Sequence, residues 1–435
     1  MIKKILQNYG IDALNEMQEA MLKATKDHRE VLLLAPTGSG KTLGFLLPAY
    51  MGLKQSIKGV QVLIVVPSRE LASQIEQVFK QMGTGFKVNA FFGGHSSRTE
   101  KNSLIDPPAV LIGTPGRLSY HFRTEHIDPT TIHTVVLDEF DKSLEFGFSR
   151  EMSTIMKHVR YVKNKVLTSA TGMEEFPDFL KMRKPYELNY LDEEEMKPSG
   201  LSFYKVDIIH NDKTETLFNL LCEFAGQPTL IFFNHRDAIG KTSELLTQKG
   251  IRHGVFQGGM EQEDREEALI KFRNGSHNVL LCTDLASRGL DIPEIQNIIH
   301  FQIPHTVQAF THRNGRTARM KAEGKAFFLV KSTDRSPDYL EDEPEKFALE
   351  ANPKLPPASE WITLRFPYGR KEKINKTDIA GLLYQKGKLS HDELGLIEVT
   401  DHRAYATVKS SKVSATIKLI KEERIKNKLV KVEIV

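Results

Sequence analysis

A run of apolar residues that ends in glycine, lysine and threonine constrains the fold of this chain more than any other feature. Residues 32–42 read "LLLAPTGSGKT". When such a turn joins a buried strand to a helix, its backbone N–H groups point into one concavity, and the N-terminus of the helix favours anions. The sequence therefore predicts a phosphate-binding loop between a strand and a helix.

The side chains of this loop suit a nucleoside triphosphate that is bound together with Mg²⁺. Lys41 is expected to reach the β- and γ-phosphates, and the hydroxyl of Thr42 is expected to bind the metal. The other residues that we expect to surround the phosphates are Thr37, Gly38, Ser39 and Gly40.

Short apolar runs rich in β-branched residues recur along the chain and alternate with segments of helical pattern. They cover residues 31–35, 62–66, 109–113, 134–138 and 165–169, and later residues 229–233, 278–283, 297–301 and 324–330. Continuous apolar strands between helices indicate a parallel sheet covered on both faces, with binding loops at the carboxyl ends of its strands. We predict an α/β fold with two tandem parallel-sheet domains. No residue-level repeat links the halves, so any duplication is one of architecture.

The predicted domain boundaries follow changes in composition. The two parallel-sheet domains are expected at residues 1–192 and 200–335, with an acidic, irregular stretch between them. Acidic residues and proline then indicate a linker over residues 336–360. Residues 361–435 alternate in the order β-α-β-β-α-β, which predicts a small α+β domain of the RNA-recognition type (RRM-like). Its second helix is expected over residues 411–425 and its last strand over 428–435.

Positive charge is concentrated in this last domain. Residues 361–435 carry 16 Lys+Arg against 9 Asp+Glu, or +7, whereas the whole chain has a formal net charge of +4. A basic domain joined to a near-neutral body indicates a module that binds a polyanion.

Cysteine content and hydropathy restrict the cellular setting. Cys222 and Cys282 are the only cysteines and lie far apart in the sequence, so we expect no disulfide partner. No stretch approaches the ~20 apolar residues of a membrane span, so we expect no membrane partner. The sequence predicts a cytoplasmic protein.

Two further motifs carry charges suited to phosphoryl transfer. Asp138 and Glu139 end an apolar run, where one carboxylate can hold Mg²⁺ and its neighbour can activate the attacking water. In "HRNGRTAR" (residues 312–319), Arg313, Arg316 and Arg319 recur at three-residue spacing, which would place them along one side of a helix or turn. Their permanent charges suit a γ-phosphate during transfer, and their location in the second half makes turnover depend on domain closure.

These motifs together resemble the DEAD-box RNA helicases over nearly all of residues 1–335. The matching segments are "PSREL" (67–71), "GG" (93–94), "TPGR" (114–117), "DEFD" (138–141), "SAT" (169–171), "TLIFFN" (229–234), "TDLASRGLDIP" (283–293) and "HRNGRTAR". The resemblance implies that the two parallel-sheet domains are RecA-like. It also implies ATP as the nucleotide, Asp138 as a Mg²⁺ ligand and Glu139 as the general base. It further implies a ribose contact from Asp291, arginine fingers at Arg316 and Arg319, and coupling of ATP to RNA through Ser169, Thr171, Asp141 and His312.

The same resemblance implies an RNA strand that lies along both parallel-sheet domains. Its contacts would be Arg69, Gly94, Thr114 and Arg117 in the first domain and Asn234, Thr283 and Arg288 in the second. Such contacts reach mainly phosphate and 2′-hydroxyl groups, and they carry little base specificity.

Phe140 and the segment before Gln18 depart from the family pattern. Phe140 replaces the alanine that gives the family its name, but the acids on both sides of it remain, so we expect no loss of chemistry. Gln18 matches the adenine-reading glutamine of the family's Q motif, although the usual Pro-Thr pair before it is missing.

The C-terminal domain resembles the RNA-binding domain of DbpA-like bacterial helicases, notably over residues 369–383 and 401–409. The resemblance implies recognition of a hairpin in large-subunit (23S) ribosomal RNA during ribosome assembly. Arg403 and Tyr405 are the first candidates for RNA contact, while Thr407 stands where a second aromatic residue would stack on a base. A structural docking domain is the alternative.

We therefore expect an ATP-dependent, RNA-stimulated helicase that locally unwinds or remodels structured RNA. The sequence leaves open a general RNA helicase of mRNA metabolism and an ATP-gated RNA clamp that separates few strands. It also leaves open a DNA helicase or translocase, which would share the phosphate loop and the arginine motif.

Overall fold

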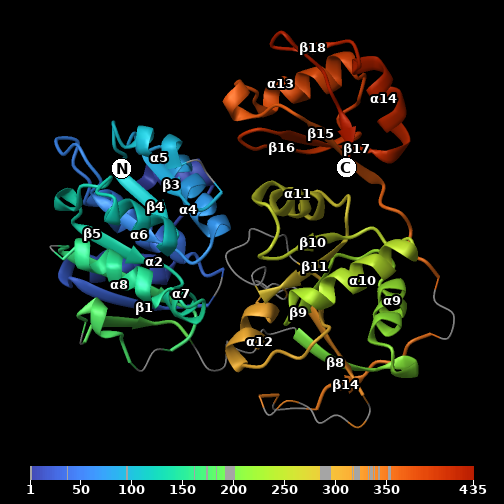
Figure 1. The fold of residues 1–435 in the computed structure, drawn as a ribbon, viewed down its shortest axis with the longest axis horizontal. Coiled ribbons are helices and arrows are strands. Elements are labelled where there is room, and N and C mark those ends of the chain that lie inside the picture. The colour runs from blue at the N-terminus through green and yellow to red at the C-terminus, as the bar shows by residue number, and fades with distance from the viewer. Residues whose placement is uncertain are drawn as a thin grey trace. The chain divides into compact units, whose positions relative to one another are not determined.

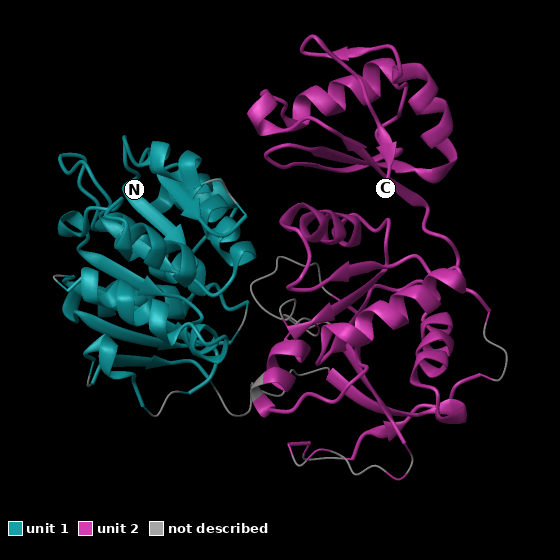
Figure 2. Cartoon of the chain, in the orientation of Figure 1, with its two compact units in different colours: residues 1–198, 288–291 teal, residues 199–287, 292–435 magenta. Residues whose placement is uncertain are grey.

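A computed structural model describes the chain as two compact units (Figure 2). The described residues are 2–191 except 37, 95–96, 161, 173–174 and 183, then 201–284, and 295–435 except 316, 318–323, 332, 334–336, 338, 341–342 and 351–353. One unit contains the described residues before residue 192, and the other contains those from Leu201 onward. No helix within these ranges is long and apolar enough to cross a membrane.

The first unit is a parallel sheet with helices on both faces (Figure 1). Its strands lie in the order β3-β4-β2-β5-β6-β1-β7, and all their pairs are parallel. The strands are β1 (Glu30–Leu34), β2 (Val62–Val65), β3 (Val88–Phe91), β4 (Val110–Gly113), β5 (Thr134–Leu137), β6 (Asn164–Ser169) and β7 (Tyr186–Asn189). The helices are α1 (Ile2–Tyr9), α2 (Glu16–Asp27), α3 (Lys41–Met51), α4 (Arg69–Gln81), α5 (Ser97–Ser103), α6 (Pro115–Arg123), α7 (Phe140–Glu145) and α8 (Ser149–His158).

Helices cover both faces of this sheet, and this is why its central strands are apolar along their whole length. In β1, Val31 and Leu33 pack in a cluster with residues of α1 to α4, whereas Leu32 and Leu34 pack with residues of α6, α7 and α8 on the other face. The five strands expected in the first half are confirmed, and each bound agrees to within one residue.

The second unit contains a parallel sheet with the same strand order as the first. Its order β10-β11-β9-β12-β13-β8-β14 equals that of the first sheet when strands are counted from the start of each unit. The strands are β8 (Leu201–Asp207), β9 (Thr229–Phe233), β10 (Gly254–Phe256), β11 (Val279–Thr283), β12 (Asn297–His300), β13 (Gly324–Val330) and β14 (Glu345–Lys346), with helices α9 (Lys213–Glu223), α10 (Arg236–Gln248), α11 (Gln262–Arg273) and α12 (Val307–Asn314). The predicted duplication of architecture without a residue-level repeat is confirmed.

The C-terminal domain is a small antiparallel sheet with two helices, as predicted. Its strands lie in the order β16-β17-β15-β20, and one hydrophobic cluster fills the space between sheet and helices. The elements are β15 (Trp361–Phe366), α13 (Lys376–Gly381) with a π-helical turn over Leu382–Lys386, β16 (Leu394–Val399), β17 (Ala404–Lys409), α14 (Val413–Ile420) and β20 (Glu433–Ile434). Two short strands, β18 (Arg424–Ile425) and β19 (Lys428–Leu429), form a separate hairpin.

This hairpin corrects the sequence expectation for the end of the chain. Helical and strand patterns predicted one helix over residues 411–425 and one strand over 428–435, but the helix ends at Ile420. Lys426 and Asn427 adopt φ of 46° and 70°, and two successive positive φ values fit the tight turn that joins twisted antiparallel strands. The turn therefore competes successfully with the helical pattern.

Part of the expected linker packs on the second sheet. β14 pairs with β8 at the sheet edge, and the ring of Phe347 meets that of Phe327 edge-on at 5.3 Å. The boundaries of the linker, 336–360, stay a prediction.

Phe140, the residue that departs from the family's alanine, belongs to the core of the first unit. It has no exposed surface, and its ring centroid lies 6.4 Å from that of Phe179 in an edge-on contact. This large side chain therefore fills core volume.

We predict that Phe140→Ala, which restores the family residue, destabilises the first unit by about 3–5 kcal/mol because it leaves a cavity. Hydrogen exchange of the β5 and β6 amides measures this free energy of opening. Phe146→Ala is the matched control: Phe146 is 39% exposed, and its loss should cost less than ~1 kcal/mol. An equal effect of the two substitutions would contradict the packing role of Phe140.

Candidate functional site

The phosphate-binding loop connects β1 to α3 and is shaped by its own hydrogen bonds. Gly38 and Gly40 have φ of 88° and 89°, a left-handed conformation that residues with a side chain rarely adopt. The Lys41 ammonium donates to the carbonyls of Ala35 (2.6 Å) and Pro36 (2.9 Å). The lysine therefore lies over the loop, at the position from which phosphates would be bound.

The N-terminus of α2 closes one side of this loop. Asn15 and Gln18 cap the helix reciprocally, since each side-chain oxygen accepts a hydrogen bond from the other's backbone N–H (2.9 and 3.2 Å). The Asn15 amide also donates to the carbonyl of Ser39 (2.9 Å), and the Gln18 amide donates to that of Gly40 (3.2 Å). The Q-motif glutamine is thus tied to the phosphate loop, and its reading of adenine stays a prediction.

A threonine that the sequence analysis did not single out organises the two acids. The hydroxyl of Thr168 in β6 donates to Asp138 Oδ1 and accepts the backbone N–H of Glu139 (3.2 Å). Asp138 is 3% exposed, and burial raises the pKa of its carboxyl group. Glu139 follows with φ of 47°, a left-handed conformation, so the chain turns sharply after β5.

Three of the four expected coupling residues meet beside these acids. Thr171 Oγ1 donates to Asp141 Oδ2 (3.1 Å), and Ser169 Oγ accepts the Thr171 N–H (3.1 Å) while it donates to the Thr171 carbonyl (2.7 Å). These bonds join the end of β6 to α7. The fourth residue, His312, is buried in the second unit.

The residues present fit a nucleotide with Mg²⁺. The Thr42 hydroxyl and the Asp138 carboxylate are oxygen donors, the ligand type that Mg²⁺ prefers. The charge of Lys41 is close enough to Asp138 to oppose the rise of its pKa. The negative charge of Asp138 complements Mg²⁺, and the positive charge of Lys41 complements the phosphates.

The carboxyl edge of the first sheet divides into two halves. The neighbouring strands β5, β6 and β1 lead into Asp138, Ser169 and the phosphate loop. The neighbouring strands β3, β4 and β2 lead into the expected RNA contacts, Gly94, Thr114 with Arg117, and Arg69.

The expected RNA contacts of the first unit are close-packed around the ends of β3 and β4. A Cβ added to Gly93 would lie 2.9 Å from the Arg69 guanidinium, so this turn and that arginine are in contact. The Thr114 N–H donates to the Phe91 carbonyl (3.1 Å). Arg117 Nε donates to the Glu100 carboxylate (2.5 Å).

In the second unit, Arg313 is a structural centre rather than a projecting side chain. It has no exposed surface and binds Asp284 through two nitrogens, Asn234 Oδ1 (2.7 Å) and the Gln302 carbonyl (2.9 Å). These partners follow β11, β9 and β12, so one guanidinium joins the carboxyl ends of three strands, next to Thr283.

Five predicted site residues lie outside the described residues. They are Thr37, Arg288, Asp291, Arg316 and Arg319.

In the C-terminal domain, Arg403 and Tyr405 face helix α11 of the same unit. Arg403 Nη2 pairs with Glu263 (2.5 Å). Tyr405 is 1% exposed, its hydroxyl lies 3.4 Å from Glu267, and burial raises its pKa to about 12. Their proposed RNA contact therefore requires this sheet face to leave α11, and it stays a prediction.

The contact between this sheet face and α11 with its following turn is polar. It also contains pairs of Arg365 with Glu267 (2.7 Å), Arg273 with Glu398 (2.6 Å) and Ser276 with Thr363 (2.7 Å).

Comparisons with known proteins agree with this geometry. Models of three families match: DEAD/DEAH box helicase over residues 15–179, helicase conserved C-terminal domain over 212–321, and DbpA RNA binding domain over 363–434. The ATP-dependent rRNA helicase RRP3 of Encephalitozoon cuniculi is 33% identical over 76% of this chain and 84% of its own length. The ATP-dependent RNA helicase DbpA of Bacillus subtilis is 26% identical over 99% of this chain and 96% of its own.

A solved structure supports the fold. The structure of Mss116p bound to single-stranded RNA and AMP-PNP is 22% identical in sequence and superposes with a TM-score of 0.68. The match covers 80% of this chain and 77% of the Mss116p chain.

The chain belongs to the DEAD-box ATP-dependent RNA helicases. Within this family its C-terminal domain makes it DbpA-like.

We predict that Thr168→Val lowers kcat for ATP hydrolysis by about 10- to 100-fold, since a hydrogen bond to a charged group contributes ~1.5–3 kcal/mol. Nucleotide affinity should change much less, because the phosphate loop remains intact. Thr168→Ser, which keeps the hydroxyl, should retain most of the rate. Steady-state hydrolysis and nucleotide binding measure both effects, and a normal kcat in Thr168→Val would exclude this role.

Proposed function

We propose that this helicase uses ATP to remodel structured ribosomal RNA locally during assembly of the large ribosomal subunit, in the cytoplasm. The observation that carries the proposal is the C-terminal domain, because residues 363–434 match a DbpA RNA-binding domain and the likeness to DbpA extends over 99% of the chain. The relative RRP3, which bears the name of an rRNA helicase, supports the same substrate class.

We assign the hydrolytic chemistry to the first unit. The loop amides and Lys41 would bind the phosphates, and Thr42 with Asp138 would hold Mg²⁺, which would neutralise phosphate charge. Glu139 takes the proton from the attacking water. Thr168 keeps the backbone of Glu139 and the carboxylate of Asp138 in a fixed relation.

Residues of the second domain complete the proposed reaction. Arg316 and Arg319 stabilise charge on the γ-phosphate, and Asp291 binds the ribose. Closure of the two domains around ATP also forms the proposed strand-binding surface, from Arg69, Gly94, Thr114 and Arg117 to Asn234, Thr283 and Arg288. RNA and ATP thereby favour the same closed state.

We predict that Glu139→Gln binds ATP and RNA but lowers kcat by at least ~100-fold, because proton acceptance is lost while the metal ligand remains. Single-turnover hydrolysis beside equilibrium binding of ATP measures this. Glu145→Gln, at the last residue of α7, removes the same charge and should stay near the parent rate. Near-normal turnover by Glu139→Gln would remove Glu139 from the role of base.

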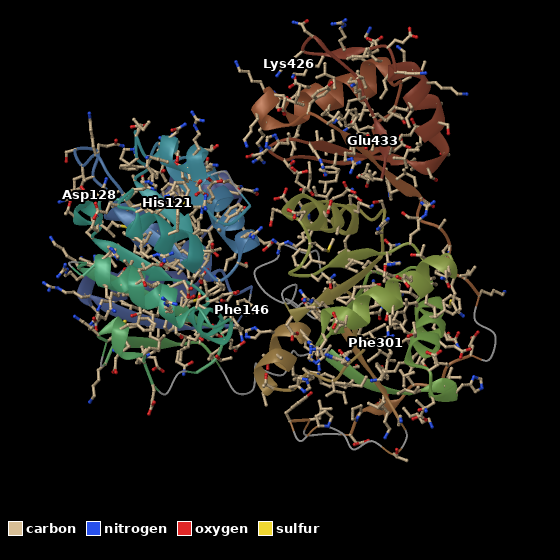
Figure 3. All side chains as sticks on the ribbon, viewed as in Figure 1. His121, Asp128, Phe146, Phe301, Lys426 and Glu433 are labelled. Carbon is tan, nitrogen blue, oxygen red and sulfur yellow. The ribbon has the colours of Figure 1, made fainter. Side chains whose placement is uncertain are left out.

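A basic rim of the C-terminal domain is our candidate for the hairpin-binding surface. We define the rim as Arg370, Lys371, Lys373, Arg424, Lys426 and Lys428. The loop after β15 and the β18–β19 hairpin come together here, since the Lys426 ammonium donates to the Lys373 carbonyl (2.6 Å) and the Lys428 ammonium lies 5.0 Å from the ring centroid of Tyr368. Figure 3 shows Lys426 at the outer edge of the domain and Glu433 on its sheet.

The ion pairs and burial of the sheet face favour the rim over the sheet as the RNA-binding surface. On the sheet, Arg403 and Arg365 are paired with glutamates, and Tyr405 is buried. On the rim, Lys371 and Lys426 pair with Asp401 (3.6 Å) and Asp378 (2.7 Å), but Arg370 and Lys373 are exposed. Exposed cations of a +7 domain bind phosphate at a smaller cost than cations that must first leave a carboxylate.

We predict that Lys373→Glu weakens binding of a 23S rRNA hairpin and reduces the slope of log affinity against log salt by about one. Lys388→Glu is a closely matched control. Both lysines are exposed and have left-handed backbone (φ 61° and 57°), but they lie at opposite ends of the sheet. Equal weakening by both substitutions in a salt titration would contradict the assignment to the rim.

A further inference from the structure

A buried glutamate joins one of the proposed RNA contacts to a buried histidine. Glu100 comes from α5 and is 4% exposed. Its Oε2 accepts a hydrogen bond from Arg117 Nε (2.5 Å) and lies 2.7 Å from His121 Nε2. Arg117 and His121 are four residues apart on α6 and share one face of the helix. One carboxylate oxygen therefore bridges both side chains.

His121 holds this carboxylate from the interior. It has no exposed surface, it lies within the first unit (Figure 3), and its ring centroid is 5.0 Å from that of Phe91. Its second nitrogen, Nδ1, is 3.2 Å from His126 Nδ1. The ring is thus fixed by packing and by contacts at both nitrogens.

The charge balance makes Glu100 a strong partner for Arg117. Its other oxygen, Oε1, is buried and has no hydrogen-bond partner among the residues that the structure describes. A carboxylate that is withdrawn from water in this way is costly unless a cation compensates it. Arg117 supplies that cation, so the position of its guanidinium follows that of the carboxylate.

A second contact also holds the guanidinium. The Arg117 guanidinium carbon lies 5.3 Å from the ring centroid of Tyr120, and its side chain is 18% exposed. A guanidinium has five N–H groups, of which Nε provides one, so the bond to Glu100 is compatible with a simultaneous contact to phosphate.

We propose that Glu100, supported by His121, is a positioning residue for RNA binding: it fixes the Arg117 guanidinium in the orientation that meets an RNA phosphate. The inference rests on the proposed function, in which Arg117 contacts RNA. The proposal predicts that neutralisation of Glu100 weakens RNA binding, whereas simple charge repulsion predicts that it strengthens binding. A glutamate near RNA repels phosphates, so its neutralisation would strengthen binding unless the glutamate acts through the arginine.

The test is Glu100→Gln in the full chain, which keeps the shape and removes the charge. Binding of oligouridylate in the presence of a non-hydrolysable ATP analogue is measured by fluorescence anisotropy. We expect the Kd for RNA, and the RNA concentration for half-maximal ATPase, to rise at least ~5-fold, while kcat at saturating RNA changes less than ~2-fold. This split separates loss of positioning from general damage to the domain.

Glu76→Gln is the matched control. Glu76 lies on α4 of the same unit and pairs with Lys80, which is 53% exposed, at 2.7 Å. The variant loses the same charge at a surface ion pair, so its RNA affinity should equal or slightly exceed that of the parent. If Glu100→Gln behaves like Glu76→Gln, the proposal is overturned.

Arg117→Gln separates the two claims. If this variant alone leaves RNA affinity unchanged, the proposed RNA contact of Arg117 is wrong. If it weakens binding while Glu100→Gln does not, only the positioning role is wrong. The proposal expects both to weaken binding and the double variant to lose little more than Arg117→Gln. Should Glu100→Gln unfold, Glu100→Asp keeps the charge on a shorter side chain, and parent-like RNA affinity in that variant overturns the proposal.

Discussion

Parallel strand pairing is the constraint on which the rest of this structure depends. In a parallel sheet every strand ends at the same edge, so loops that are distant in the sequence become neighbours. The order β3-β4-β2-β5-β6-β1-β7 places the phosphate loop and both acids on one half of that edge and the expected RNA contacts on the other. The second sheet repeats the order and uses Arg313 to join three strand ends.

Features with a strong local pattern could be predicted from the sequence. The central strands are continuous apolar runs because both faces are buried, and the phosphate loop needs glycines at left-handed positions. The edge strand β7, "YELN", is mostly exposed and lacks such a run. Patterning gives no sign of it.

Residues that act through tertiary contacts left no pattern to recognise. Thr168 reads as an ordinary strand residue in "KVLTS", and only the pairing of β5 with β6 brings it to Asp138. Glu100 stands in the polar stretch "SSRTEKNS", which resembles a solvated helix, yet it is 4% exposed. Three-residue spacing suggested that Arg313 projects with the other arginines, but three strand ends enclose it.

In the C-terminal domain, the sheet face packs on helix α11, whereas the same face of an RNA-recognition domain usually stacks on bases. The charges of this face are paired with those of α11 and the turn that follows. Thr363 and Thr407 are completely buried. The basic rim is therefore our proposed site for an RNA hairpin.

Stimulation of ATP hydrolysis by nucleic acids tests the central claim most directly. The comparison uses a 23S rRNA hairpin with a single-stranded extension, an unrelated RNA hairpin of equal length with the same extension, and the DNA equivalent of the first, all at one salt concentration. The account predicts half-maximal stimulation at the lowest concentration for the rRNA substrate, weaker stimulation by unrelated RNA, and little by DNA. Equal stimulation by DNA and RNA would contradict the assignment as an RNA helicase, and equal stimulation by both RNA hairpins would contradict the ribosomal target.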